Sequence, residues 1–329
     1  MLYRTLHNNS LLAFILVPFI LFLFWIRVFL FDGSAPISFD GISMPLWEWM
    51  VRPLFGNNAY LAAAFSFVLV LLTAFTINRL AGRHGLLGSA SVLPALMYAL
   101  LVSGFLVVQR LNVVWMFNLF FLLAIERIWG IVIHGRKEGR SFDGALLVGI
   151  GSLVYVKGLY LYPLLLVVMG GLRVLTIRTF LASLMGVLLP FVLSAGYFFF
   201  VDRFMEFGVF IVFNLLSSTG QLSHNISTQI YLFFLGGIIL VGIVNVFRFL
   251  PTQKIITRKL FRSVVWLTLL TFGACLTPFF SVELTPLIAI GPSMILAFWL
   301  DKMSKKIWQE VILWVFIGIT IAVQIIHIG

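Results

Sequence analysis

The acidic side chains that could do chemistry in this sequence begin in a polar stretch near the N-terminus. Asp32 and Asp40 belong to a repeated Phe-Asp-Gly, and Glu48 follows in Trp47-Glu48-Trp49. A carboxylate that projects into a cavity could act as a general base or as a metal ligand. Phe-Asp-Gly also suits a turn, because Asp bonds its own backbone and Gly permits a positive φ. Both interpretations are open at this point.

Three basic residues, Lys157, Arg110 and Arg203, could serve as ligands of a phosphate. A lysine ammonium is a compact charge with three donors, and a guanidinium offers a planar fork of donors. Asp202 and His224 are the other polar candidates, and a solvated loop residue is the simpler interpretation of His224. The sequence contains no P-loop, no dinucleotide-binding glycine motif, no Cys/His zinc spacing and no Ser-His-Asp set.

The composition shows that the elements positioning these side chains are membrane helices. The 329 residues are 62% hydrophobic and only 10% charged, with a mean hydropathy of +1.12. A soluble domain carries about 25% charged residues, so a soluble enzyme, a coiled coil and a disordered chain are excluded. The net charge of +11 fits basic loops that set membrane topology, and nucleic acid is not expected as a partner. We expect a single all-α polytopic membrane domain over residues 1–329.

Charge-free windows of about 20 apolar residues locate the predicted spans. They place helices over roughly 9–30, 53–78, 84–109, 111–132, 179–201, 229–247, 263–282, 284–300 and 309–327. Between Asp143 and Arg173 the apolar stretch is interrupted by Lys157, with 13 residues before it and 15 after it. This stretch is either one span with a central lysine or two short helices that meet at Val156-Lys157-Gly158.

The distribution of basic residues favours two short helices, because Lys and Arg gather in cytoplasmic loops. With a cytoplasmic N-terminus and a hairpin, 17 of the 22 basic residues lie in the cytoplasm. A single span reverses everything downstream and leaves 8 inside and 13 outside, with Lys157 in the bilayer. The sequence therefore predicts about eleven spans, N-terminus inside and C-terminus outside. Helices this short cover about 20 Å of a roughly 30 Å hydrocarbon core, so their junction requires a protein cavity or a polar groove.

Two further segments are predicted to lie at the outer membrane surface. Residues 204–216 are apolar but too short to cross a bilayer, which indicates an interfacial or re-entrant helix. The loop 31–58 is expected to fold onto the surface, with Trp47 and Trp49 at the depth of the lipid headgroups.

Several features of residues 10–205 follow one another in a recognisable order. Acidic residues come directly after the first helix, the second helix ends in a basic turn, the third contains Pro94, and the fourth ends in Glu126-Arg127. Asp143-Gly-Ala-Leu-Leu-Val-Gly-Ile-Gly-Ser-Leu-Val-Tyr-Val-Lys157 then leads into Tyr162-Pro163. This layout resembles the membrane-embedded glycosyltransferases of the C-type fold, which take sugars from polyprenyl-phosphate carriers. By this resemblance, residues 9–205 are the core helices and 206–329 the variable C-terminal helices.

Within that superfamily the chain most resembles a group of small multi-pass inner-membrane proteins of Bacteroidota-type bacteria, through residues 142–202. The resemblance implies that Asp32 or Asp40 serves as base or divalent-metal ligand, and that Lys157, with Arg110 or Arg203, takes the lipid phosphate. Membership of the bacterial group implies no activity. Two hypotheses therefore stand: a lipid-linked glycosyltransferase, and a non-catalytic scaffold or lipid-binding subunit that joins other membrane proteins of a bacterial envelope complex.

Overall fold

The fold is described by a computed structural model over residues 11–31, 44–56, 58–87, 91–216, 226–274, 281–303 and 305–326. Across these residues the elements are helices, with no strand. Six helices are long and apolar enough to cross a membrane: α2 (Leu11–Phe31), α4 (Ala59–Arg83), α7 (Val113–His134), α10 (Ile177–Phe200), α12 (Ile226–Phe249) and α16 (Lys306–Ile326). The chain is therefore a multi-pass helical membrane protein, as the composition predicts.

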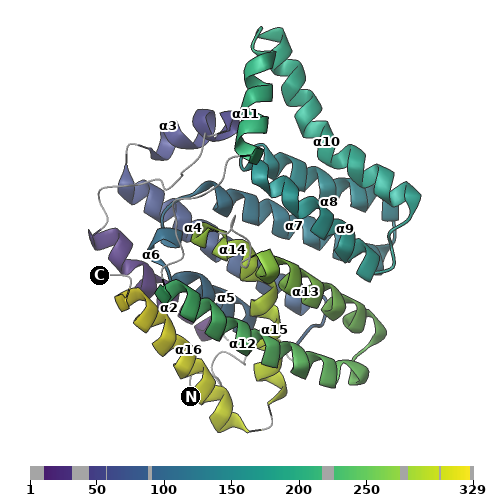
Figure 1. Cartoon of the computed structure of the whole chain (residues 1–329). Coiled ribbons are helices and arrows are strands. Elements are labelled where there is room, and N and C mark those ends of the chain that lie inside the picture. The colour runs from purple at the N-terminus through teal and green to yellow at the C-terminus, as the bar shows by residue number, and fades with distance from the viewer. Residues whose placement is uncertain are drawn as a thin grey trace.

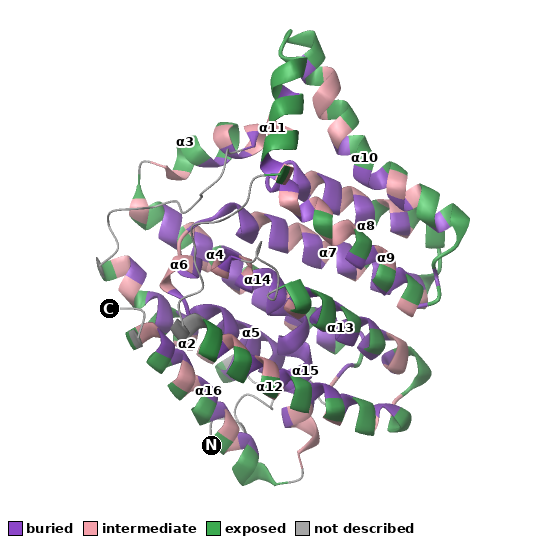
Figure 2. Ribbon diagram, viewed as in Figure 1, coloured by how far each residue is buried: buried purple, intermediate pink, exposed green. Residues whose placement is uncertain are grey.

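Two helices at the centre of the bundle are enclosed by the others (Figures 1 and 2). Every residue of α5 (Leu93–Ser103) is buried, and α15 (Ile290–Lys302) is buried from Ile290 to Phe298. Helices α2, α4 and α16 pack against α5, while α12 and α13 (Ile255–Ala274) pack against α15. The outer helices expose large apolar side chains instead, such as Met185 and Phe200 of α10, which suits contact with lipid.

The helices expected over 84–109 and 284–300 are both interrupted. The first is replaced by α5 and α6 (Leu106–Gln109), which are separated at Gly104-Phe105, and α5 begins at Leu93 because Pro94 fits the first turn of a helix. The second is divided into η4 (Val282–Leu284), α14 (Thr285–Ile288) and α15, with a bend of 52°. The carbonyl of Ser103 in the last turn of α5 is buried, and it accepts hydrogen bonds from the side-chain amides of Gln109 and Gln324.

The segment around Lys157 is divided at the predicted junction. Helix α8 (Lys137–Ser152) ends before Tyr155, and η2 (Val156–Leu161) leads into α9 (Tyr162–Gly171). Phe117 of α7 lies so close to Gly158 of η2 that a Cβ there would overlap its ring. Phe117 can therefore pack against this turn only if residue 158, directly after Lys157, has no side chain.

The segments expected at the outer membrane surface form helices, with one difference from expectation. Helix α11 (Phe204–Leu216) has the bounds predicted from the sequence, and η1 (Trp47–Val51) leads into α3 (Arg52–Phe55). Trp47 is only 1% exposed and packs in the main core, whereas Trp49 is 51% exposed and stacks on Phe198 at 5.7 Å between ring centroids. Trp49 alone has the exposure of an interfacial anchor, because protein surrounds the other indole.

Two connections that carry basic residues lie on one side of the bundle. Figure 1 shows the α9–α10 and α12–α13 connections on the right, with α3 and the C-terminal end on the left. The first connection carries Arg173 and the second carries Lys254. This arrangement is compatible with the predicted topology; the eleven spans and their direction stay predictions.

Candidate functional site

The structure describes part of the predicted outer site. Asp32, Asp40 and His224 lie outside the described residues, so the carboxylates expected to act as base or metal ligands are not located. Among the residues that are described, no three His, Cys, Asp or Glu side chains gather as metal ligands do. The other predicted site residues, which are Glu48, Arg110, Lys157, Asp202 and Arg203, are all placed.

A buried carboxylate that sequence reasoning missed lies within electrostatic range of Lys157. Glu283 of η4 is 9% exposed, and its charge acts on both Lys157 and Tyr155. Helix α6, which Arg110 directly follows, also packs against η4. The lysine at the helix junction, the segment that carries Arg110 and a buried carboxylate thus meet in one place. A signal was present, since Glu283 is the sole acidic residue between Glu206 and Asp301 in the sequence.

The remaining outer candidates are engaged elsewhere. Arg203 forms an ion pair of 2.6 Å with Glu206 at the tip between α10 and α11, where Asp202 also lies. The other end of α11 reaches η2, through a hydrogen bond from the Tyr160 hydroxyl to the Leu215 carbonyl. Residues 203 and 215 are about 18 Å apart along a helix, so Arg203 does not share a site with Lys157. Glu48 pairs with Arg52 one turn away at 2.9 Å.

An apolar groove adjoins Lys157. Its volume is about 270 Å³, and its lining is mainly apolar and aromatic: Met44, Pro45, Leu46, Trp49, Leu153, Leu193, Ser194, Tyr197, Phe198 and Phe207. Val156, the residue directly before Lys157, packs in one buried cluster with Leu153, Phe198 and Phe207 of this lining. Lys157 therefore directly follows a residue that packs against the groove lining, although Lys157 is not itself one of the lining residues.

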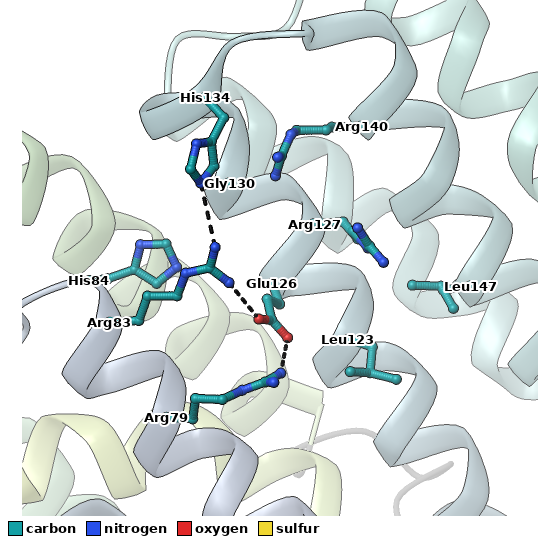
Figure 3. Close-up of a pocket in the computed structure, with 10 residues that line it drawn as sticks. All are labelled: Arg79, Arg83, His84, Leu123, Glu126, Arg127, Gly130, His134, Arg140 and Leu147. Carbon is teal, nitrogen blue, oxygen red and sulfur yellow. Dashed lines mark hydrogen bonds and ion pairs between the residues drawn. The ribbon is translucent and has the colours of Figure 1, made fainter.

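A second site, at the opposite end of α8, was not anticipated. It is a pocket of about 320 Å³ between α4, α7 and α8, lined by Arg79, Arg83, His84, Leu123, Glu126, Arg127, Gly130, His134, Arg140 and Leu147 (Figure 3). Sequence reasoning used these arginines only to set topology. The spacing held a signal, because residues four apart share a helix face: Arg79 with Arg83 on α4, and Glu126 with Gly130 and His134 on α7.

Glu126 organises one half of this basic pocket. Its carboxylate accepts hydrogen bonds from the guanidinium of Arg79 at 2.5 Å and from that of Arg83 at 3.2 Å. Arg83 also approaches His134 Nε2 at 3.5 Å. Figure 3 shows the two arginines meeting the carboxylate from the α4 side. The carboxylate thus links the end of α4 to α7, and it is only 15% exposed.

The other half of the pocket is held by Arg127 and Arg140. A Cβ at Gly130 would overlap the Arg140 guanidinium, so the glycine leaves space for this side chain to lie against α7. Within the described part of the chain, neither Arg127 nor Arg140 pairs with a carboxylate. These two guanidiniums keep their donors for solvent or for a ligand.

His84 completes the pocket beneath Arg83. It is 6% exposed, its ring meets Trp129 edge-on at 5.4 Å, and among the described residues neither ring nitrogen has a hydrogen-bond partner. Burial, together with the positive charge of Arg83, lowers the pKa of His84. A buried imidazole without a partner is costly, since buried polar groups are normally hydrogen-bonded.

Comparison with the profiles of known families, with curated proteins and with solved structures finds no match. Function is therefore argued from the two sites themselves. The outer one combines an ammonium with an apolar groove. The other is a hollow with four guanidiniums, one carboxylate and two imidazoles, which leaves a charge of +3 while the histidines are neutral.

Proposed function

We propose that this chain is a glycosyltransferase-like protein of a bacterial inner membrane that binds a polyprenyl phosphate at its predicted outer end. One observation carries the proposal: the residue before Lys157 is packed into the lining of an apolar groove. An isoprenoid chain requires apolar surface, and its phosphate requires a cation at the end of that surface. The break at η2 supplies the second requirement next to the first.

The chemistry follows from the two parts of the ligand. The lipid chain would lie along Trp49, Phe198 and Phe207, where burial of its methylene groups is favourable. The phosphate would accept charge-assisted hydrogen bonds from Lys157. The negative charge of Glu283 also acts on Lys157, so the phosphate would share the electrostatic field of the lysine with a carboxylate.

Sugar transfer additionally needs a base. In the transferase hypothesis a carboxylate takes the proton of the acceptor hydroxyl, the bond between sugar and lipid phosphate breaks, and the carrier phosphate leaves. By the resemblance described above, Asp32 or Asp40 would supply that carboxylate. Their alternative role would be to bind a divalent metal. Lys157 would stabilise the leaving phosphate as its charge develops.

A second candidate function is a non-catalytic lipid-binding subunit of an envelope complex. The presence of the buried Glu283 within electrostatic range of Lys157 favours it, because an opposite charge near the ammonium also suits a purely structural role. This candidate keeps the lipid in the groove and needs no base.

The binding proposal is tested by native mass spectrometry of the full chain, purified with an added long-chain polyprenyl phosphate. Lys157→Gln is expected to lose the bound lipid, whereas Arg203→Gln should keep it, because Arg203 lies at the α10–α11 tip. Trp49→Ala should weaken retention through the groove. Equal lipid retention by Lys157→Gln and the control would refute the proposal.

The two candidates are separated by a transfer assay with a radiolabelled polyprenyl-phosphate sugar. A transferase releases the sugar to an acceptor and loses turnover in Asp32→Asn or Asp40→Asn while still binding lipid. A lipid-binding subunit retains the intact donor in the wild type and in both variants.

A further inference from the structure

We propose that the basic pocket between α4, α7 and α8 binds a phosphate-bearing anion, independently of the lipid site at Lys157. The two sites are separate in space. Arg140 lies in the first turn of α8 and Lys157 lies beyond its last turn, and a helix of 16 residues is about 24 Å long. The pocket opens at the end of the bundle that the distribution of basic residues assigns to the cytoplasm.

The donors fit a phosphate. A guanidinium presents planar pairs of N–H groups that match two oxygens of a phosphate, and such charge-assisted pairs are stronger than neutral hydrogen bonds. Arg79 and Arg83 already give donors to Glu126, whereas Arg127 and Arg140 have no carboxylate partner in the described structure. Figure 3 shows Arg127 and Arg140 on the α8 side, across the pocket from the Arg79–Glu126–Arg83 group.

The volume fits as well. A water molecule occupies about 30 Å³ in the liquid, so a hollow of about 320 Å³ has room for one phosphate group or two linked phosphate groups with some water. The net charge of +3 matches that class of ligand.

The simpler alternative is that these arginines only fix the orientation of the helices in the membrane. A basic residue with that role extends into water or headgroups and needs no concave surroundings. Two features of the pocket go beyond it. Gly130 is the residue that lets the Arg140 guanidinium lie against α7, and His84 is buried with both ring nitrogens unpaired among the described residues. The first feature places a guanidinium at the hollow, and the second leaves a buried imidazole in its wall without a hydrogen-bond partner among the described residues.

The phosphate could come from a soluble metabolite or from the headgroup of an anionic lipid, and the chemistry of recognition is the same. The test therefore has two arms, both with the full chain in nanodiscs. In the first, inorganic pyrophosphate is titrated into nanodiscs of phosphatidylcholine and binding is measured by calorimetry. In the second, the nanodiscs contain phosphatidylglycerol and phosphatidylcholine, and native mass spectrometry counts the phosphatidylglycerol that stays bound.

The decisive variant is Arg127→Gln/Arg140→Gln. Each charged hydrogen-bonding group is worth about a tenfold change in affinity, so the double variant should bind pyrophosphate about a hundredfold more weakly, or release the bound phosphatidylglycerol. The matched control is Arg178→Gln/Arg248→Gln, which removes the same charge on the same predicted side from exposed residues outside the pocket. The control should behave like the wild type.

A second variant keeps every charge. Gly130→Ala should displace the Arg140 guanidinium and weaken binding at least severalfold, while the electrostatic potential of this end stays the same. Loss of pyrophosphate binding in both pocket variants assigns the site to a soluble phosphate, and loss of phosphatidylglycerol alone assigns it to a headgroup. If the wild type binds neither probe, or if the pocket variants match the control in both arms, the proposal is overturned. A failure here leaves the Lys157 proposal untouched, since its readout is polyprenyl phosphate.

Discussion

Replacing Glu126 by Gln should destabilise the fold measurably, because this carboxylate ties α4 to α7. It accepts from Arg79 and Arg83, whose side chains are 58% and 52% exposed, and it is 15% exposed itself. Exposed ion pairs contribute about 0.2–1 kcal/mol each, and the low exposure of the shared carboxylate places both pairs near the upper end. Loss of the two pairs, with four guanidiniums then facing one another, should cost about 2 kcal/mol.

The assay is thermal unfolding of the detergent-solubilised chain. With an unfolding entropy of about 2.1 cal/mol/K per residue, a loss of about 2 kcal/mol corresponds to a fall in Tm of roughly 3 °C for a chain of 329 residues. The difference should shrink as salt is raised, because the repulsion between the unpaired arginines is screened. Added pyrophosphate should raise the Tm of Glu126→Gln more than that of the wild type, since the competing carboxylate has been removed.

The matched control is Glu138→Gln, which removes an exposed carboxylate of α8 with no ion pair in the described structure. Its Tm should stay within about 1 °C of the wild type, as expected for a surface substitution. If Glu126→Gln and Glu138→Gln unfold at the same temperature, the carboxylate does not hold the helices together and the electrostatic account of the pocket is refuted.

Two further outcomes follow from single residues. The pKa of His84 in the folded chain lies below its ordinary value of 6.5. As the pH falls, the unfolded chain therefore binds this proton before the folded chain does. The free energy of unfolding should be at its full value above about pH 6.5 and should decrease as the pH falls below 6.5. Unfolding curves at pH 7 and pH 5 should show this loss in the wild type and a smaller loss in His84→Gln. Gly158→Ala should lower the free energy of unfolding by about 1–3 kcal/mol, because the new Cβ would overlap the Phe117 ring. Gly170→Ala is the control and should not destabilise the fold, because the space around Gly170 is open. Equal Tm values for the two variants would contradict the packing described at η2.

Hydropathy predicted the long helices well but did not show the interruptions at the centre of the bundle. Hydropathy averaged over a window of residues does not distinguish apolar residues that face lipid from those that face protein. It therefore predicts α5 and α15 as parts of full membrane spans. Enclosed helices need not match the bilayer thickness, because neighbouring side chains such as Gln109 and Gln324 satisfy their ends. Only the three-dimensional structure shows where these two segments are interrupted.

The candidate sites were predictable to different degrees. The junction at Lys157 followed from local charge, since one lysine divides an apolar stretch and the count of basic residues selects the hairpin. The basic pocket needed tertiary information: its arginines come from α4, α7 and α8, and nothing local shows that Gly130 makes room for Arg140. The count of basic residues on each side of the membrane predicts that these arginines lie at one end of the bundle, but it does not show that they line one pocket.

The structure also explains how two helices too short for the bilayer can meet at a lysine. An ammonium left in hydrocarbon costs about 2.5–3.5 kcal/mol on insertion scales, and the sequence led us to expect water or a lipid headgroup to remove that cost. Glu283 supplies an opposite charge from η4, and Phe117 covers Gly158 from α7. The junction is thus stabilised by protein before any lipid binds.

Substituting Glu283 with Gln removes that charge, so an anionic lipid becomes the favourable partner of Lys157. Lipid retention should therefore rise in Glu283→Gln, while thermal stability without lipid should fall. A variant that retains less lipid than the wild type would show that Glu283 supports the phosphate site instead of competing with it.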